Sequence, residues 1–329
     1  MMHGLGHEVF LYAGPESEAQ VTEHIPCLTE EERAAIHGDD HFVMSSFDYS
    51  LPSWKKFNAT VADRIKERMQ TDLPQILCLI GGLAHKQIAD SLPDMLCCEF
   101  SIGYSGSFAP FRVFESSEWM HTIYAHQGNC DPTALDGRWF DDVIPGSFSP
   151  DDFPFRAEKE DFLLFVGRLI ERKGLGIAVD VAKRLGKKLV VAGQGNPPTD
   201  AHVEYVGIIG PEQRGDLMSR AHALLCPTVY IGPFENVAVE AQLCGTPAIG
   251  TDWGAYRSTI EDGVTGFRCR TMHEFLRAVE RAPELDPHYI RDRAVRLYST
   301  EAVAKLYQRY FDRLGQLFSQ EGWYWLPPS

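Results

Sequence analysis

Two cations that follow a short apolar run have the spacing and setting expected of a phosphate-binding pair. Arg168 and Lys173 stand five positions apart in a segment bounded by Gly167 and Gly174. A cation just before a helix is disfavoured by the helix dipole, so this placement indicates contact with a ligand rather than a solvated surface. Nucleotides bind beyond the carboxyl ends of parallel strands. The segment therefore predicts a site for a phosphorylated nucleotide.

A second loop, 232–236, leads into a short helix that carries Glu240 and ends at Cys244 and Gly245. The free N–H groups at a helix start favour an anionic ligand, and an acid in the first turns is favoured by the helix dipole. If both loops follow strands of one sheet, they point at the same crevice.

Apolar runs and helical patterns alternate through the second half of the chain. Patterns of buried strands occur at 162–166, 188–192, 203–206, 223–227 and 247–251, and helical patterns occur at 175–185 and 212–222. This alternation predicts a doubly wound parallel sheet.

The first half is less regular, with Pro- and Gly-rich linker signals at 145–154. Periodicity predicts helices at 53–72 and 111–124, strands at 75–80 and 95–100, and a C-terminal helix whose apolar stripe, 303–318, is a packing face.

Five motifs in order along the chain resemble those of the family-four, or group 1, retaining glycosyltransferases of the GT-B fold. They lie at 143–153, 167–174, 192–195, 234–249 and 262–267. The resemblance implies an α/β chain of two Rossmann-like domains whose parallel sheets face each other across a cleft. It places an acceptor-side domain at 1–147, a donor-binding domain at 148–302, and a helix at 303–329 that returns to the first domain.

The resemblance also implies roles for individual residues. Arg168 and Lys173 would grip the donor diphosphate and neutralise charge as the glycosidic bond breaks, and Glu240 would accept hydrogen bonds from the ribose. Further donor contacts are expected from the two loops and from the strand ends that face the base, namely Gly232, Pro233, Phe234, Glu235, Asn236, Val237, Gly193, Val206 and Gly207.

The sequence departs from the family pattern at the acid that contacts the donor sugar. Eight positions before Glu240 stands Gly232, and the nearest acid, Glu235, occupies a position that the family gives to glycine. Glu235 either reaches the sugar from a shifted backbone, as a third catalytic residue, or fills the pocket. The substitution Gly232→Glu is expected to strengthen donor binding if the family contact can be rebuilt.

On the acceptor side the candidates are His85, which faces the cleft or is a plain loop histidine, and Tyr104. The chain opens on what is the second strand of the first domain in this family. Either the first strand is truncated or this chain dispenses with it.

The composition disfavours several classes of partner and cofactor. Residues 1–150 hold 9 Lys and Arg against 22 Asp and Glu, and the whole chain has a net charge of −15. Such an acidic first half disfavours nucleic acid and anionic membranes as partners. The eight cysteines are scattered, which favours reduced thiols and a cytoplasmic location. No Asp-x-Asp triplet provides metal ligands, so we expect no metal or other cofactor, only a nucleotide-sugar co-substrate.

These features predict a metal-independent, retaining transfer of a sugar from a nucleotide-diphosphate sugar to a glycan or small-molecule acceptor. Two alternatives stay open at this stage. One is a nucleotide-sugar-binding protein with weak or lost transfer, and the other is a non-hydrolysing sugar-nucleotide epimerase of the same fold.

Overall fold

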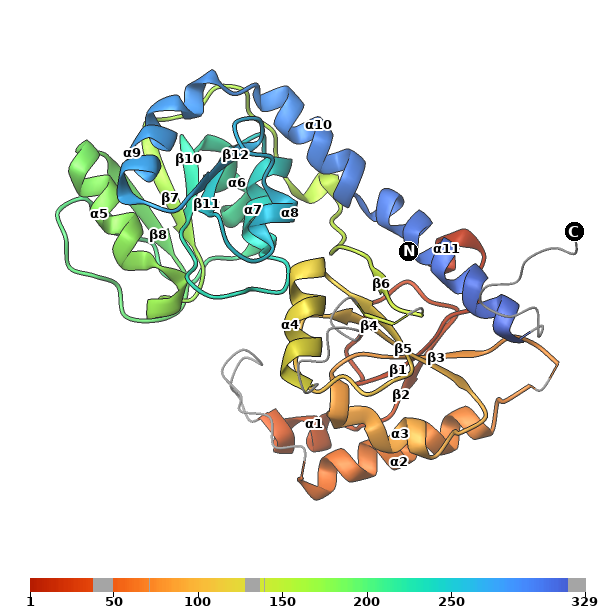
Figure 1. The fold of residues 1–329 in the computed structure, drawn as a ribbon. Helices are drawn as coiled ribbons and strands as arrows, with labels where there is room; N and C mark the ends of the chain where they lie inside the picture. Colours follow the sequence, from red (N-terminus) through yellow and green to blue (C-terminus); the bar gives the residue numbers. More distant parts are fainter. Residues whose placement is uncertain (38–49, 71, 128–136, 139, 319–329) are drawn as a thin grey trace, which may run out of the picture. The chain divides into compact units, whose positions relative to one another are not determined.

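The computed structural model describes residues 1–37, 50–70, 72–127, 137–138 and 140–318, which form two compact units. The first unit comprises Met1–Val113, Arg138–Asp142 and Ala304–Ser329, and the second comprises Phe114–Gly137 and Val143–Val303 (Figure 1). The second unit thus includes the stretch 114–137, which the sequence predicts to belong to the first domain. The predicted domain limits themselves stay predictions.

The second unit is built on a six-stranded parallel sheet in the order β12-β11-β10-β7-β8-β9. Its strands are β7 (Phe162–Val166), β8 (Lys188–Ala192), β9 (Val203–Tyr205), β10 (Ala223–Cys226), β11 (Ala248–Thr251) and β12 (Gly266–Cys269). Its helices are α4 (Ser117–Gln127), α5 (Leu175–Leu185), α6 (Pro211–Arg220), α7 (Asn236–Leu243), α8 (Tyr256–Thr259), α9 (Met272–Arg281) and α10 (Pro287–Tyr298). The alternation predicted from the sequence is confirmed.

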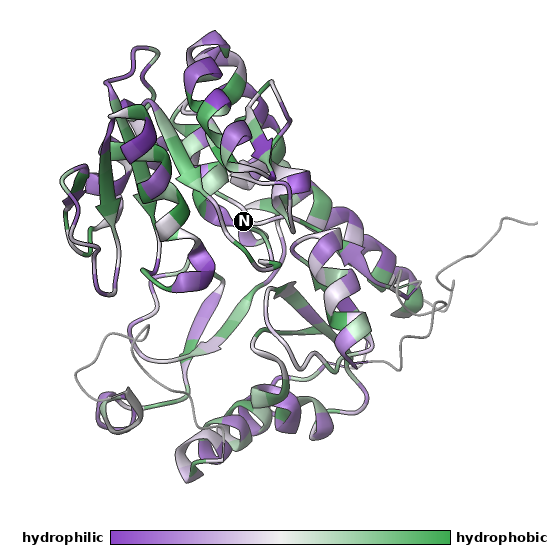
Figure 2. Ribbon diagram, turned by 60° about the vertical axis from the view of Figure 1, so that its left-hand side comes forward, coloured by the Kyte–Doolittle hydropathy of each residue, from purple (hydrophilic) through white to green (hydrophobic). Residues whose placement is uncertain are grey.

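Helices cover both faces of this sheet, because side chains alternate between the faces along each strand. On β7, Leu163 and Phe165 pack with residues of α5 and α9, whereas Phe162 and Leu164 pack with residues of α6, α7 and α10. Hydrophobic residues accordingly follow the strands in Figure 2.

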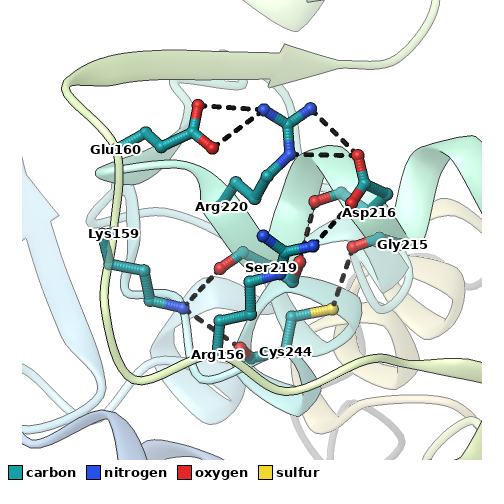
Figure 3. A network of polar contacts seen from close by, with 8 residues as sticks. All are labelled: Arg156, Lys159, Glu160, Gly215, Asp216, Ser219, Arg220 and Cys244. Atoms are coloured by element: carbon teal, nitrogen blue, oxygen red, sulfur yellow. Dashed lines mark hydrogen bonds and ion pairs between the residues drawn. The ribbon is translucent and has the colours of Figure 1, made fainter.

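One lysine ties the carboxyl ends of α6 and α7 together (Figure 3). The Lys159 ammonium donates to Ser219 O at 2.9 Å, to Cys244 O at 3.1 Å and to Thr246 Oγ1 at 2.8 Å. A cation is favoured at helix carboxyl ends, where carbonyls lack intrahelical donors. This contact fixes the end of the helix that begins at the loop 232–236.

The first unit contains two small sheets. β1 (Phe10–Ala13) pairs in parallel with β2 (Glu23–Pro26), and a four-stranded sheet has the order β3-β4-β5-β6. The strands of the second sheet are β3 (Ile76–Leu79), β4 (Leu96–Ile102), β5 (Phe111–Phe114) and β6 (Asp142–Val143), of which Phe114 and Val143 belong to the second unit. The helices are α1 (Glu30–His37), α2 (Pro52–Lys66), α3 (Lys86–Asp90) and α11 (Thr300–Phe318), which belongs to this unit from Ala304 onward.

The predicted helix at 111–124 is wrong at its start. Residues Phe111–Phe114 form the buried strand β5, and the helix α4 begins only at Ser117. The Ser116 hydroxyl accepts a hydrogen bond from the Trp119 N–H at 3.1 Å and so marks the helix start. An apolar run of four residues fits a buried strand as well as a helix, which is why periodicity misplaced it.

The apolar stripe of the C-terminal helix is confirmed as a packing face. Tyr307, Tyr310 and Leu314 are buried on α11, and the Tyr310 hydroxyl donates to Phe140 O at 2.9 Å. The Tyr307 ring lies edge-on to Phe100 of β4. In the described part of the chain, no helix combines the length and the apolar character that crossing a bilayer requires.

Candidate functional site

The candidate site lies where the strand order of the second unit reverses. The chain fills the sheet outward from β7 through β8 to β9, returns to the other side of β7 with β10, and continues outward to β12. In open parallel sheets this switch point, outside the carboxyl ends of the two central strands, is where ligands bind. The loops after β7 and β10 carry the residues that the sequence singled out.

Backbone contacts hold these two loops together. Gly174 has a left-handed φ of +75°, and a Cβ added to it would lie 2.0 Å from Pro227 O, so only glycine fits. The Val229 N–H donates to Arg172 O at 2.9 Å. The two loops that the sequence predicted to face one crevice are therefore in direct contact.

Lys173 joins the loops through its side chain. Its ammonium lies 2.8 Å from Glu235 Oε2 and 5.1 Å from the centre of the Tyr230 ring. Burial lowers the pKa of Lys173, but the Glu235 carboxylate and Tyr230 outweigh it, so the pKa is raised and the lysine stays charged.

The other two cations of this loop are more accessible. Arg168 is exposed and makes no ion pair within the described residues. Arg172 lies over the Tyr230 ring at 4.9 Å. An exposed guanidinium and a half-buried ammonium on one loop can hold two oxygens of a diphosphate through charge-assisted hydrogen bonds.

Glu235 is held in an unusual conformation just before α7. It has a left-handed φ of +64°, which is rare for a residue with a side chain. Its side chain is 3% exposed, and Oε2 accepts from Lys173 and, at 3.1 Å, from the Tyr256 hydroxyl. Oε1 is buried and has no hydrogen-bond partner.

The rest of the loop 232–237 divides between core and surface. The Phe234 side chain packs against Tyr298 and Phe148, so this residue offers a ligand only its backbone. Pro233 O accepts a hydrogen bond from the Ser116 hydroxyl at 2.6 Å. Asn236 is exposed and Val237 is half-buried in the first turn of α7, where backbone N–H groups have no intrahelical acceptor.

Glu240 lies one turn further along α7 and is buried against α6 rather than against Lys173. Its Oε2 is 3.3 Å from Arg214 Nε. Burial raises the pKa of Glu240, and the Arg214 charge opposes that shift. The structure thus gives this acid a cationic partner that no local sequence pattern indicates.

Gly193, Val206 and Gly207 lie on the neighbouring loops, after β8 and β9. A Cβ on Gly193 would lie 1.9 Å from Gly167 O, and the Gly193 N–H donates to Gly207 O at 2.8 Å. The loops after β7, β8 and β9 are therefore packed backbone to backbone, and the donor-binding role of these three residues stays a prediction.

His85 and Tyr104, the candidates in the first unit, lie on neighbouring loops after β3 and β4. His85 Nδ1 is 2.9 Å from Asn58 Oδ1, and burial lowers the pKa of the histidine. The Tyr104 hydroxyl donates to the buried Glu99 at 3.4 Å. Both have structural partners, and their acceptor-side role stays a prediction.

Tyr256, Tyr230 and Arg214 are the neighbours that sequence reasoning missed. Tyr256 and Arg214 lie more than 20 residues from the side chains that they contact, and none of the three belongs to a motif. Within the described residues, no three His, Cys, Asp or Glu side chains gather as metal ligands would.

Residues 160–283 match the family model described as Glycosyl transferases group 1. D-inositol 3-phosphate glycosyltransferase of Kribbella flavida is 33% identical over 128 residues, which cover 32% of this chain and 30% of that protein. The chain spans between about a third and about a half of the length of the first curated relatives that it matches.

Solved structures share the fold over a larger part of the chain. AviGT4, a glycosyltransferase involved in avilamycin A biosynthesis, has a TM-score of 0.67 at 22% identity, covering 97% of this chain and 87% of its own. Anabaena HepE in complex with UDP-glucose has a TM-score of 0.61 at 14% identity, covering 78% and 82%. The fold is therefore of the GT-B type.

Proposed function

We propose that this protein transfers a sugar from a nucleotide-diphosphate sugar to an acceptor, because residues 160–283 match the family model of the group 1 glycosyltransferases. The observation that carries the proposal is the meeting of the loops after β7 and β10 at the switch point, where the first of these loops carries the exposed Arg168 and the charged Lys173. A diphosphate is an anion that fits two cations on one strand-end loop.

We further propose that the reaction retains the anomeric configuration and needs no metal. Retention rests on the family resemblance, and the support for metal independence is the set of positive groups that the chain itself supplies to the phosphates. Arg168 and Lys173 would stabilise the leaving diphosphate, and the backbone N–H groups at the start of α7 would bind oxygens of the donor. Glu240 would hold the ribose, and the rim at Gly193, Val206 and Gly207 would receive the base.

The acceptor is proposed to be a carbohydrate or another hydroxylated small molecule. The Kribbella relative is named for an inositol 3-phosphate acceptor, which supports this class without specifying it. A cytoplasmic location is proposed because seven cysteines, the ones in the described part of the chain, are all unpaired.

The first test is calorimetry of UDP, GDP, ADP, dTDP and CDP against wild type, Arg168→Ala and Lys173→Met. We expect one nucleotide to bind and each variant to weaken that binding about 10- to 150-fold, the value of one charge-assisted hydrogen bond of about 1.5–3 kcal/mol. Lys183→Met, an exposed lysine paired with Asp200 on the same unit, is the matched control and should bind like wild type.

Two results would contradict the proposal. If none of the five nucleotides binds the wild type, the switch point is not a donor site and the proposal fails. If a nucleotide binds but no acceptor accelerates its release from the nucleotide sugar, the protein is a nucleotide-sugar-binding protein without transferase activity.

A further inference from the structure

Gly232 and Glu235 behave as one structural unit. The Glu235 side chain folds back over the α-carbon of Gly232, and a Cβ added at position 232 would lie 1.9 Å from Glu235 Oε1. The left-handed φ of Glu235 turns the side chain in this direction. The Glu235 carboxylate therefore occupies the space that a side chain at position 232 would need.

The two oxygens of this carboxylate differ in their partners. Oε2 receives both available donors, Lys173 Nζ at 2.8 Å and the Tyr256 hydroxyl at 3.1 Å. Oε1 is buried and receives none. A carboxylate can only accept hydrogen bonds while it is ionised, so Oε1 is an acceptor that the folded chain leaves without a donor.

The unpartnered Oε1 and the left-handed φ of Glu235 both destabilise the folded chain, and the fold alone does not explain them. A buried acceptor without a donor is unfavourable, and so is a residue with a side chain in the left-handed region. Strain of this kind gathers at ligand sites, where a ligand repays it. Here both costs fall on one residue at the switch point of the sheet, next to the lysine assigned to the diphosphate.

We propose that Glu235 Oε1 accepts a hydrogen bond from a hydroxyl of the transferred sugar, and that Gly232 is required to keep Oε1 in place. This inference rests on the proposed function and adds to it the residue that reads the sugar. The chemistry selects the ligand group, because an anionic oxygen repels a phosphate and needs an O–H donor.

Lys173 connects the sugar to the nucleotide in this arrangement. Its ammonium has three N–H donors, of which one is used by Glu235, so others remain for the diphosphate. A ligand that satisfies both Oε1 and Lys173 carries a hydroxyl close to a diphosphate, as a nucleotide-diphosphate sugar does. Glu235 is thus a specificity-determining residue for the sugar, whereas Arg168 serves the nucleotide.

The test separates sugar affinity from nucleotide affinity. The nucleoside diphosphate that binds best in the five-member panel is measured beside its glucose, galactose, mannose and N-acetylglucosamine conjugates. The ratio of the dissociation constant of the free diphosphate to that of the tightest conjugate gives the contribution of the sugar. We expect this ratio to exceed tenfold in the wild type.

In Glu235→Gln the amide oxygen will face Lys173 and Tyr256, so the amide NH₂ replaces Oε1 and cannot accept. We expect the sugar contribution to fall at least tenfold, the scale of one charge-assisted hydrogen bond, while the free diphosphate binds as tightly as before or tighter. Gly232→Ala should also lower the sugar contribution and leave the affinity for the free diphosphate unchanged, because its Cβ displaces Oε1.

Two controls complete the design. Glu280→Gln removes an exposed carboxylate of α9, and Gly176→Ala adds a Cβ that meets nothing within 4 Å. Neither should change the ratio, and circular dichroism confirms that all variants fold. Because two unrelated substitutions act on the same oxygen, a folding defect in one leaves the other to decide.

The outcomes distinguish this inference from the proposed function. If no diphosphate binds the wild type, the donor site fails and the sugar contact fails with it. If the diphosphate binds but no conjugate binds tighter, or if Glu235→Gln weakens the diphosphate and its conjugates equally, the donor site stands and Glu235 is only a structural partner of Lys173.

Discussion

At the scale of single residues, position 232 shows how an absent side chain sets the chemistry of its neighbour. The sequence alone suggests that a glutamate there strengthens donor binding. In the structure that space already holds Glu235 Oε1, so Gly232→Glu would put two carboxylates in one buried pocket, where like charges repel. We expect the single variant to bind nucleotide sugar at least tenfold more weakly than wild type.

The double variant Gly232→Glu/Glu235→Gly should recover most of that loss. It keeps one carboxylate in the pocket, approaching from the other side, and it places a glycine at the left-handed position, where glycine is favoured. Calorimetry with the nucleotide sugar measures both variants. A single variant that binds more tightly than wild type would show that the pocket has room for both acids.

The cations of this site could be predicted from the sequence, but the contacts among its buried side chains could not. Arg168 and Lys173 could be predicted because two flanking glycines and a strand end are visible in the local sequence. The contact of Tyr256 with Glu235 could not, because it depends on how a short helix after β11 packs behind the loop after β10. The left-handed conformation of Glu235 is disfavoured by its residue type, and its one signal is the glycine that the family has at this position.

At the scale of elements, Lys159 is the contact that sets the ends of α6 and α7 (Figure 3). Replacing it with methionine keeps the length of the side chain but leaves Ser219 O, Cys244 O and Thr246 Oγ1 without this donor. We expect Lys159→Met to lower the free energy of unfolding by about 1–3 kcal/mol at neutral pH, the cost of buried acceptors left unsatisfied. Urea unfolding measures the difference.

The same lysine gives a pH dependence whose sign follows from its pKa. Burial lowers the pKa of Lys159 from the ordinary 10.5 to about 8. Between these two values the unfolded chain binds more protons than the folded one, so the contribution of Lys159 to stability rises with pH across that window and is smallest below it. The stability difference between wild type and Lys159→Met should therefore widen from about pH 8 to pH 10.5.

Lys183→Met is again the matched control, because this exposed lysine makes one ion pair at the surface. Its difference from wild type should stay small and flat with pH, since exposed pairs contribute little. A Lys159→Met difference that narrows with rising pH would mean that the charged lysine, not the neutral one, is favoured in the fold.

Elements of the second unit could be predicted more fully than those of the first. There, apolar runs of four or five residues alternate with amphipathic helices that end in glycine, as α5 does at Gly186. In the first unit the run at 111–114 was merged with the following helix, because a short buried strand has no periodicity of its own. The pairing of β1 with β2 alone, and the order of β3 to β6, are tertiary facts that no local pattern contains.

At the scale of the whole molecule, the chain is two units with separate cores. Residues of β7 and its neighbours pack in two clusters on either face of one sheet. A third cluster, around Val61, Leu77 and Ile88, belongs to the first unit. The net charge is shared almost equally, with 12 Lys and Arg against 20 Asp and Glu in the first unit and 19 against 26 in the second, because the acidic stretch 1–150 contributes residues to both units. A ligand of the switch point contacts only the second unit in our proposal, so its effect on stability should be confined there.

Tyr310 offers a test of that independence, because it lies on α11 at the end of the chain yet belongs to the first unit. It is fully buried and its hydroxyl donates to Phe140 O. Tyr310→Ala should lower the free energy of unfolding of the first unit by about 3–5 kcal/mol, the range for truncating a buried aromatic ring. Tyr310→Phe should lower it by about 1 kcal/mol, because one hydrogen bond is lost.

Hydrogen exchange followed by mass spectrometry should then show lost protection in β3 and β4 and unchanged protection in β8 and β10. Tyr289→Ala, at an exposed position of α10, is the control that should leave both units as they are. Equal loss of protection in both units would mean that they unfold together, and a nucleotide bound to the second unit would then stabilise the whole chain.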